Sequence, residues 1–338
     1  MAHTVGFIDL EGWEEERIRK EFPDEELFLA KKSLAEISDE DKAKLEVLSV
    51  FVSSKVTKEE LLKMPALKFI STRSTGFDHL ALAACKERGI IVSYVPGYGD
   101  HTVAEYAFGL LLSLTRKVYT ALDRIKESGP FSPEELRGTD LSGKTIGIIG
   151  TGRIGMVSVN IALGFDMRVL AYDPYPKEET AAELGYRYVS LDELLANSDV
   201  VTLHAPYSEA THHLLNAKNL KQIKRGVFIV NTARGGLIET DALVTALQDG
   251  TVAGAALDVL EGEGEIGDET ALLRHADADP EAVKLALENR VLITMPNVLV
   301  SPHNAFNSQE AMERIMDVTY GNLRAFLAGK PEHVVPQQ

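Results

Sequence analysis

The 338-residue sequence has one cysteine, Cys85, and few aromatic residues, which make up 7% of the chain. A single cysteine excludes an intrachain disulfide and a zinc site built from several thiolates, so we expect a reducing compartment. Basic residues are scarce too: 35 Lys and Arg stand against 51 Asp and Glu, which gives a formal net charge of -16. A field of that sign repels phosphate backbones and anionic lipids. We therefore expect neither nucleic acid nor a membrane as a partner.

Long hydrophobic runs are also missing. The longest apolar stretch, residues 104–114, is interrupted by Glu105 and Ser113 and is far shorter than the roughly 20 residues of a membrane span. Residues 1–10 contain no basic region followed by an apolar stretch, so we expect no signal peptide and a cytoplasmic protein. Hydrophobic residues at 45% and charged residues at 25% are typical of a globular chain, here long enough for two domains of about 150 residues.

Short β-branched runs alternate with helical stretches along the whole chain, which predicts parallel sheets covered by helices on both faces. A first series of strands is expected at residues 5–8, 47–52, 67–71 and 90–94. A second series is expected at residues 145–149, 168–172, 199–203, 227–231, 254–257 and 298–300. Six strands in this rhythm are typical of a dinucleotide-binding sheet. Between the two series, residues 102–117 are apolar on nearly every side and predict a helix buried all round, either between domains or against another subunit.

A glycine motif follows the first strand of the second series. Gly150, Gly152 and Gly155 form G-x-G-x-x-G where an apolar strand meets a helix. The first glycine permits a tight turn, the second lets the backbone approach a pyrophosphate, and the third lets the helix pack close to the strand. Asp173 stands 18 residues after Gly155, as expected of an acid that binds ribose hydroxyls and repels a 2′-phosphate. The pattern predicts NAD rather than NADP, although a structural glycine turn or a methyltransferase-type nucleoside site would also use such glycines.

Three charged or titratable residues follow later strands of the same series. Arg234 can clamp a carboxylate with two parallel hydrogen bonds, although a surface arginine paired with a loop carboxylate is the simpler alternative. His303 is a candidate acid/base, although a lone histidine after a strand is more often structural. Glu263 by itself would be solvated. Together, an anion clamp, an imidazole and a carboxylate to orient it are suited to the reduction of a 2-oxo acid.

Other reactive residue types predict no site. Adjacent histidines such as His212 and His213 usually diverge, and no third ligand stands at a useful spacing, so we expect no metal. The acidic run of residues 261–269 predicts a mostly solvated loop. Cys85 falls on a helix that faces a core, which predicts a buried and inert thiol.

Six ordered stretches resemble the D-isomer-specific 2-hydroxyacid dehydrogenases, and the resemblance covers essentially the whole chain. The stretches are residues 150–155, 173–175, 204–206, 231–235, 256–263 and 301–306. The resemblance implies an α/β protein with two doubly wound parallel-sheet domains. A Rossmann NAD-binding domain of residues 99–298 would be inserted into a flavodoxin-like substrate domain of residues 1–98 and 299–338, with the chemistry in a cleft between them.

The resemblance also implies roles for single residues. Arg234 would bind the substrate, His303 would transfer the proton, and Glu263 would pair with His303 and favour its protonated form. Cofactor contacts are implied for Gly150, Gly152, Arg153, Ile154, Gly155, Asp173, His204, Ala205, Pro206, Thr211, Thr232, Ala233, Arg234, Asp258 and His303. Substrate contacts are implied for Thr75, Gly76, Tyr98, Arg234, His303 and Phe306.

Within the family the chain is most similar to the D-lactate dehydrogenases, because residues 71–78 and 95–98 also match that branch. The resemblance therefore implies NADH-dependent reduction of pyruvate to D-lactate. Two places depart from the branch. The loop after the strand at 47–52, which often carries an aromatic residue that reaches the substrate, is Ser53-Ser54-Lys55, and a frequent histidine of the long helix is Tyr106.

Alternatives to a D-lactate dehydrogenase stay open. A glyoxylate or hydroxypyruvate reductase, or another 2-oxo acid reductase of the family, would use the same residues. A non-enzymatic NAD(H)-sensing interaction protein could use the same scaffold, since a fold does not fix a function. The apolar helix at residues 102–115 further predicts a two-fold homodimer.

Overall fold

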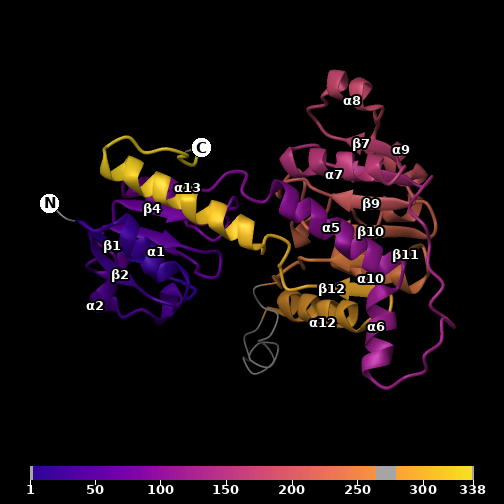
Figure 1. Ribbon diagram of the computed structural model, residues 1–338, viewed down its shortest axis with the longest axis horizontal. Coiled ribbons are helices and arrows are strands. Elements are labelled where there is room, and N and C mark those ends of the chain that lie inside the picture. Colours follow the sequence, from indigo (N-terminus) through magenta and orange to yellow (C-terminus); the bar gives the residue numbers. More distant parts are fainter. Residues whose placement is uncertain (1–2, 264–278, 337–338) are drawn as a thin grey trace. The chain divides into compact units, whose positions relative to one another are not determined.

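The computed structural model describes residues 3–263 and 279–336 of the chain. The chain forms two compact units (Figure 1): Met1–Tyr98 with Ser308–Gln338 make up the first, and Gly99–Asn307 make up the second. The later boundary lies at residue 308 rather than at the predicted 299. Residues 301–305 stay with the second unit because three of their polar groups donate hydrogen bonds to the carboxylate of Asp258.

A five-stranded parallel sheet lies at the centre of the first unit, in the order β2-β1-β3-β4-β5. Its strands are β1 (Thr4–Phe7), β2 (Glu26–Leu29), β3 (Val47–Val50), β4 (Phe69–Thr72) and β5 (Ile91–Ser93). This is the flavodoxin-like order that we predicted. The sequence analysis missed β2, because a short edge strand without a single buried residue gives a weak hydrophobic signal.

Helices cover both faces of this sheet, and each face has its own core. The helices of the unit are α1 (Glu14–Glu21), α2 (Asp39–Lys42), α3 (Lys58–Leu62), α4 (Leu82–Glu87) and α13 (Gln309–Leu327). Phe7 packs in one core with Ile18 of α1 and Tyr320 of α13. Ile70 packs in the other core, which includes Leu61 of α3. Successive strand residues point to opposite faces, so both faces of the sheet are apolar.

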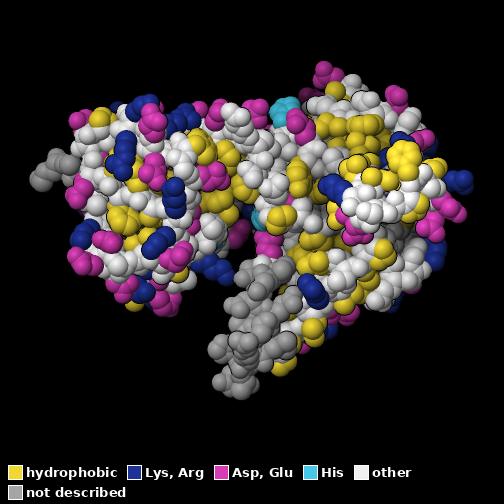
Figure 2. Space-filling view, turned by 60° about the horizontal axis from the view of Figure 1, so that its bottom comes forward, with side chains coloured by type: hydrophobic (Ala, Val, Ile, Leu, Met, Phe, Trp, Pro, Cys, Tyr) yellow, Lys and Arg dark blue, Asp and Glu magenta, His cyan; other side chains and the backbone are white. Residues whose placement is uncertain are grey.

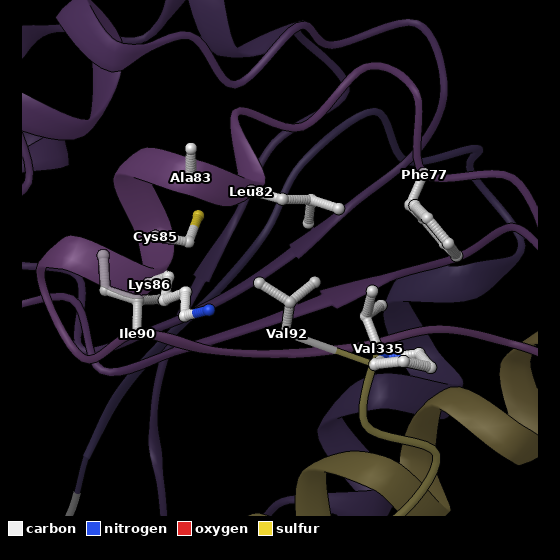
Figure 3. A pocket seen from close by; sticks show the side chains of 9 residues that line it. Phe77, Leu82, Ala83, Cys85, Lys86, Ile90, Val92 and Val335 are labelled. Atoms are coloured by element: carbon white, nitrogen blue, oxygen red, sulfur yellow. The ribbon is translucent and has the colours of Figure 1, made fainter. Parts of the chain in front are cut away.

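A cavity of about 300 Å³ lies in the first unit beside α4 and β5 (Figure 3). It is lined by Phe77, Leu82, Ala83, Cys85, Lys86, Ile90, Val92, Val335 and Pro336. Cys85 is buried, and burial raises the pKa of its thiol to about 11. The reactive thiolate is therefore scarce at neutral pH. The prediction of a buried thiol is confirmed.

A seven-stranded parallel sheet forms the centre of the second unit, in the order β12-β11-β10-β9-β6-β7-β8. Its strands are β6 (Thr145–Ile149), β7 (Arg168–Tyr172), β8 (Arg187–Tyr188), β9 (Val200–Leu203), β10 (Val227–Asn231), β11 (Val252–Leu257) and β12 (Val298–Val300). The predicted Rossmann topology and α/β class are confirmed. The one strand that the sequence analysis missed is β8, which has two residues at the edge of the sheet.

Helices pack on both faces of the seven-stranded sheet. The helices of the unit are α5 (Asp100–Thr115), α6 (Val118–Lys126), α7 (Arg153–Gly164), α8 (Glu178–Leu184), α9 (Leu191–Asn197), α10 (Thr240–Gln248) and α12 (Pro280–Thr294), of which α6 follows α5 without a buried residue. One core contains Leu111 of α5 and Val159 of α7, and the other contains Leu194 of α9 and Leu243 of α10. A Cβ at Gly147 of β6 would lie 2.3 Å from Leu194 Cδ2, so the absence of a side chain lets α9 pack this closely.

The long helix α5 is not buried all round in the single chain. Val103, Ala107 and Leu111 face the core, whereas Glu105 and Gly109 are exposed on the other side. The helix that follows, α6, has no buried residue at all. Four of its large hydrophobic side chains are exposed: Val118, Tyr119, Leu122 and Ile125.

Charged side chains of both signs are interspersed over the visible surface of each unit (Figure 2). A basic stripe of the kind that binds nucleic acid is not seen on that face. Within residues 3–263 and 279–336, no helix has the length and apolar character needed to cross a membrane.

Candidate active site

The carboxyl ends of the parallel strands meet at one edge of the seven-stranded sheet. Predicted site residues follow six of these strands: Gly150 after β6, Asp173 after β7, His204 after β9, Arg234 after β10, Asp258 after β11 and His303 after β12. The order of the strands reverses between β6 and β9, which are neighbours in the sheet. Open α/β sheets bind ligands at such a switch point.

The three glycines after β6 differ in how closely the surrounding protein packs against them. Gly150 has a φ of +90°, and a Cβ there would lie 2.8 Å from the backbone nitrogen of Ala205. A Cβ at Gly155 would lie 2.0 Å from the carbonyl oxygen of Gly150. At Gly152, by contrast, a Cβ would meet no atom of the described residues within 4 Å. The packing explains the first and third glycines, whereas it leaves Gly152 open, as expected of a glycine that is predicted to let a cofactor approach.

An NAD pyrophosphate fits this turn. Gly152 precedes α7, and the first-turn amides of that helix, which include those of Arg153 and Ile154, lie at the positive end of its dipole. The Arg153 side chain is turned toward α5, where Nε donates to Asp100 Oδ2 at 2.8 Å. The backbone of the turn therefore offers the anion site.

Asp173 lies at the end of β7 and contacts the glycine turn directly. Its Oδ2 accepts a hydrogen bond from the backbone nitrogen of Thr151 at 2.7 Å, and its Oδ1 accepts one from the backbone nitrogen of Tyr175 at 2.8 Å. These bonds fix the carboxylate beside the predicted pyrophosphate site. This is where an acid must stand to meet the adenosine ribose.

His204 begins the segment after β9. Its Nε2 lies 3.1 Å from Thr202 Oγ1, and burial lowers the pKa of the ring to about 4, so the imidazole is neutral at pH 7. Further along, Thr211 Oγ1 donates to the carbonyl oxygen of Pro206 at 2.8 Å and closes the turn between them. The segment predicted to contact the cofactor is thus ordered by its own hydrogen bonds.

A buried asparagine shapes the turn that presents Arg234. Asn231 ends β10; its Nδ2 donates to the carbonyl oxygen of Arg234 at 2.9 Å, and its Oδ1 accepts from the backbone nitrogen of Ala233 at 3.0 Å. The half-buried guanidinium donates from Nη1 to the carbonyl oxygen of Ala233 at 2.7 Å. The sequence analysis did not assign a role to Asn231. A polar amide at the end of an apolar strand is the signal that could have revealed it.

Two further residues constrain this turn. The hydroxyl of Thr232 is buried and has no hydrogen-bond partner among the described residues, which suits the predicted cofactor contact. A Cβ at Gly235 would lie 2.0 Å from the carbonyl carbon of Leu260. The turn after β10 therefore contacts the segment after β11 backbone to backbone.

The predicted histidine and carboxylate lie together. His303 Nδ1 is 2.7 Å from Glu263 Oε1, and both side chains are more than a third exposed. This contact leaves Nε2, on the other side of the ring, for a substrate. The His303 ring also meets the Phe306 ring edge to face, with centroids 6.4 Å apart.

Asp258 holds the segment that carries His303. Its carboxylate accepts hydrogen bonds from Ser301 Oγ at 2.5 Å and from the backbone nitrogens of Asn304 and Ala305 at 2.8 Å each. Its carbonyl oxygen accepts a fourth bond from the backbone nitrogen of His303 at 2.8 Å. Burial raises the pKa of Asp258, and the bonds from Ser301 and the two amides oppose that rise. The sequence analysis predicted a cofactor contact here and missed this positioning.

The first unit gathers its predicted substrate residues at the carboxyl ends of two neighbouring strands. Thr75 and Gly76 follow β4, and Tyr98 follows β5. Thr75 is exposed, and its Oγ1 donates to the carbonyl oxygen of Val95 at 2.7 Å. That bond ties the two strand ends to each other.

The loop after β3 corrects one statement of the sequence analysis. The strand ends at Val50 rather than at residue 52, so the loop begins with an aromatic residue, Phe51. The Phe51 ring lies 5.9 Å from the guanidinium carbon of Arg73. Ser54 is buried and donates to Asp9 Oδ1 at 2.8 Å, which makes it part of the loop's framework. The loop therefore does carry an aromatic side chain.

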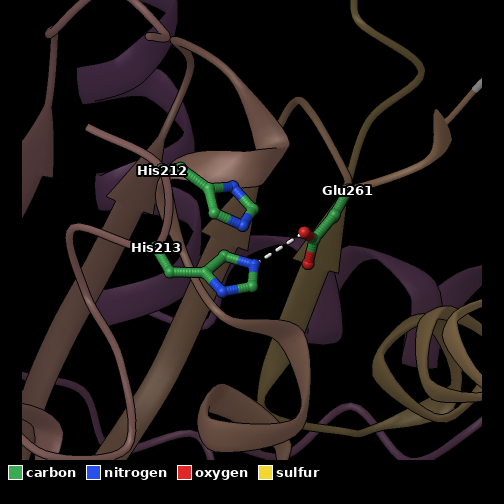
Figure 4. A group of neighbouring side chains, drawn as sticks. All are labelled: His212, His213 and Glu261. Atoms are coloured by element: carbon green, nitrogen blue, oxygen red, sulfur yellow. Dashed lines mark hydrogen bonds and ion pairs between the residues drawn. The ribbon is translucent and has the colours of Figure 1, made fainter. Parts of the chain in front are cut away.

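The expectation that His212 and His213 diverge is wrong. Their rings stack with centroids 3.7 Å apart, and Glu261 lies beside them (Figure 4). Glu261 is not solvated as predicted, since only 20% of its side chain is exposed. Residues 264–269 of the same acidic run lie outside the described residues.

Comparison with known proteins agrees with this geometry. Residues 108–305 match the family model described as "D-isomer specific 2-hydroxyacid dehydrogenase, NAD binding domain". The D-lactate dehydrogenase of Escherichia coli is 39% identical over 280 residues, which cover 82% of each chain. The glyoxylate reductase of Thermofilum pendens is 36% identical over 302 residues, which cover 88% of this chain and 81% of the reductase.

A solved structure extends the comparison to three dimensions. It is a D-lactate dehydrogenase of Aquifex aeolicus complexed with NAD and lactic acid. It superposes with a TM-score of 0.84 and is 37% identical, and the match covers 96% of both chains. From the matched model, the relatives and the geometry together, the chain belongs to the family of D-isomer specific 2-hydroxyacid dehydrogenases, NAD-dependent oxidoreductases whose NAD-binding domain is formed here by the second unit.

Proposed function

We propose that this enzyme reduces pyruvate to D-lactate. The observation that carries the proposal is the 2.7 Å contact between His303 and Glu263, at the sheet edge that also presents Arg234 and the glycine turn. The E. coli and A. aeolicus relatives, both D-lactate dehydrogenases, support the choice of substrate.

The cofactor supplies a hydride to the carbonyl carbon of the 2-oxo acid. Arg234 grips the carboxylate with two parallel hydrogen bonds and polarises the neighbouring oxo group, because a planar guanidinium matches a carboxylate better than a single ammonium does. As negative charge develops on the oxo oxygen, His303 gives it a proton from Nε2. Glu263 accepts from Nδ1 and fixes the orientation of the ring for that transfer.

The first unit contributes candidates for substrate recognition. Thr75, Gly76 and Tyr98 lie at the carboxyl ends of neighbouring strands, and the Phe51 ring adds an aromatic surface after β3. In the second unit, Phe306 packs against His303 and gives an apolar wall for a small side chain.

The second candidate is a glyoxylate or hydroxypyruvate reductase. The T. pendens relative, a glyoxylate reductase, supports it. The pairing of His303 with Glu263, and the position of Arg234 at the same edge of the sheet, favour either enzyme over a non-enzymatic NAD(H)-sensing protein. The buried free thiol of Cys85 supports a reducing, cytoplasmic location.

A panel of 2-oxo acids with NADH at fixed pH tests the substrate. Pyruvate should give the highest kcat/KM, above glyoxylate, hydroxypyruvate and 2-oxo acids with larger side chains. The product should be D-lactate by chiral chromatography. A higher kcat/KM for glyoxylate or hydroxypyruvate would identify the second candidate as the function. Absence of turnover with every acid would instead favour a non-enzymatic NAD(H)-sensing protein.

Variants of His303 and Arg234 should fail in different ways. His303→Gln should lower kcat by about 10² to 10⁴, because the amide cannot donate the proton. Arg234→Lys should mainly raise KM, because one ammonium cannot reproduce the two-pronged grip. Steady-state kinetics with pyruvate measure both, and fluorescence titration with NADH is the control for cofactor binding. Near-normal turnover of His303→Gln would make His303 a structural residue.

The cofactor preference depends on Asp173. We expect kcat/KM to favour NADH over NADPH by on the order of 10 to 1000-fold, because the carboxylate repels a 2′-phosphate. Asp173→Asn should shrink that ratio while keeping the hydrogen bond from Thr151. Kinetics with both cofactors measure it, and equal use of NADH and NADPH by the unaltered enzyme would contradict the assignment.

A homodimer would cover the apolar side of α6. Val118, Leu122 and Ile125 follow one another at helical spacing and are all exposed, so a second copy is the partner that we propose. Light scattering should give twice the 37.0 kDa of one chain. Leu122→Glu should shift the protein toward the monomer, whereas Leu62→Glu, at a still more exposed leucine of α3, should leave it dimeric. A monomer before any substitution would refute the proposal.

A further inference from the structure

Two histidines and one carboxylate converge beside the turn that presents Arg234. His212 and His213 end the segment after β9, and Glu261 lies in the segment after β11 (Figure 4). His213 has a φ of +50°, a left-handed backbone that turns its ring to the same side as that of His212. The two rings stack with 26° between their planes, so their nitrogens face Glu261 together.

The three side chains offer their ligating atoms at close range. His213 Nε2 lies 2.7 Å from Glu261 Oε1, and one ligand atom from each of the three residues falls within 4.8 Å of the others. Tetrahedral zinc bonds nitrogen and oxygen at about 2.0 to 2.2 Å. His212 is the exposed member of the group, so a small rotation of its side chain closes the site around an ion.

Contacts from outside the group orient two of the ligands. Tyr207 Oη lies 3.0 Å from His212 Nδ1, which leaves the Nε2 lone pair of His212 for a metal. Thr240 Oγ1 donates to Glu261 Oε2 at 2.8 Å, which leaves Oε1 toward the histidines. Histidine and carboxylate ligands of metals are held by hydrogen bonds of this kind.

We propose that His212, His213 and Glu261 bind one divalent transition-metal ion of the zinc class. Imidazole nitrogens select zinc, nickel, copper or cobalt over magnesium and calcium, which prefer oxygen ligands. A water molecule takes the fourth position. The ion takes the place of the hydrogen atom between His213 Nε2 and Glu261, and the neutral ring then carries its proton on Nδ1.

The site would join two segments that carry the proposed chemistry. Glu261 stands two residues before Glu263, and the backbone nitrogen of His213 donates to the carbonyl oxygen of Gly236, two residues after Arg234. A bound ion would therefore stiffen the segments after β9 and β11 against each other. The inference does not depend on which 2-oxo acid is the substrate, because metal binding is measured without turnover.

The test is a titration of untagged, metal-free protein with ZnCl₂ by calorimetry. We expect one zinc per chain, and cobalt(II) in its place should give the visible absorption bands of a tetrahedral site. His212→Gln and Glu261→Gln should each weaken zinc binding by more than about 10-fold, because each removes a ligand. Tyr207→Phe removes only an outer hydrogen-bond partner of His212, so it should weaken zinc binding by less than the loss of either ligand.

Two control variants separate this site from ordinary histidine–carboxylate pairs. His3 and Glu46 form a pair of similar exposure, with 3.2 Å between them and no second histidine. His3→Gln and His303→Gln should both leave the zinc stoichiometry and affinity unchanged. Thermal unfolding without metal checks that each variant is folded. Absence of zinc binding, or binding that survives both His212→Gln and Glu261→Gln, would overturn the proposal.

Discussion

The hydrogen bonds of the Asp258 carboxylate are the interactions on which the candidate active site of the second unit depends. Asp258 is buried, and it collects a hydroxyl and two amides from one short segment, while its own carbonyl oxygen holds the amide of His303. These bonds hold the chain after β12 in the turn that brings His303 to Glu263. They also explain why residues 301–305 belong with the NAD-binding unit rather than with the unit that follows in sequence.

The alternation of short apolar runs with helical stretches along the sequence made most of the fold predictable. Strands β6, β7 and β10 begin and end where the apolar runs do, because helices cover both faces of the sheet there. The edge strands β2 and β8 were missed because neither contains a buried residue, whereas the edge strands β5 and β12, which do, were predicted. The rule that ligands bind at the carboxyl ends of parallel strands led to Arg234, Glu263 and His303.

What the sequence could not show are contacts between residues far apart along the chain. Glu261 lies 48 positions from His213, and the sequence around either residue does not indicate that the two are in contact. Asp258 was predicted as a cofactor contact because it lies in a stretch that resembles the family. Its hydrogen-bond partners follow more than forty positions later, so the sequence around Asp258 does not indicate them. Phe51 was overlooked because the end of β3 was placed two residues too late, which assigned its ring to the strand.

The backbone at His303 has a φ of +49°, a conformation that costs a residue with a side chain about 1 kcal/mol. Glycine would adopt this φ without strain. A histidine at this position therefore makes the folded backbone less favourable than a glycine would. The folded state tolerates the strain because the neighbouring bonds outweigh it. Stability and the proposed proton transfer therefore favour different residues at this one position, because a glycine would relieve the backbone strain and remove the imidazole.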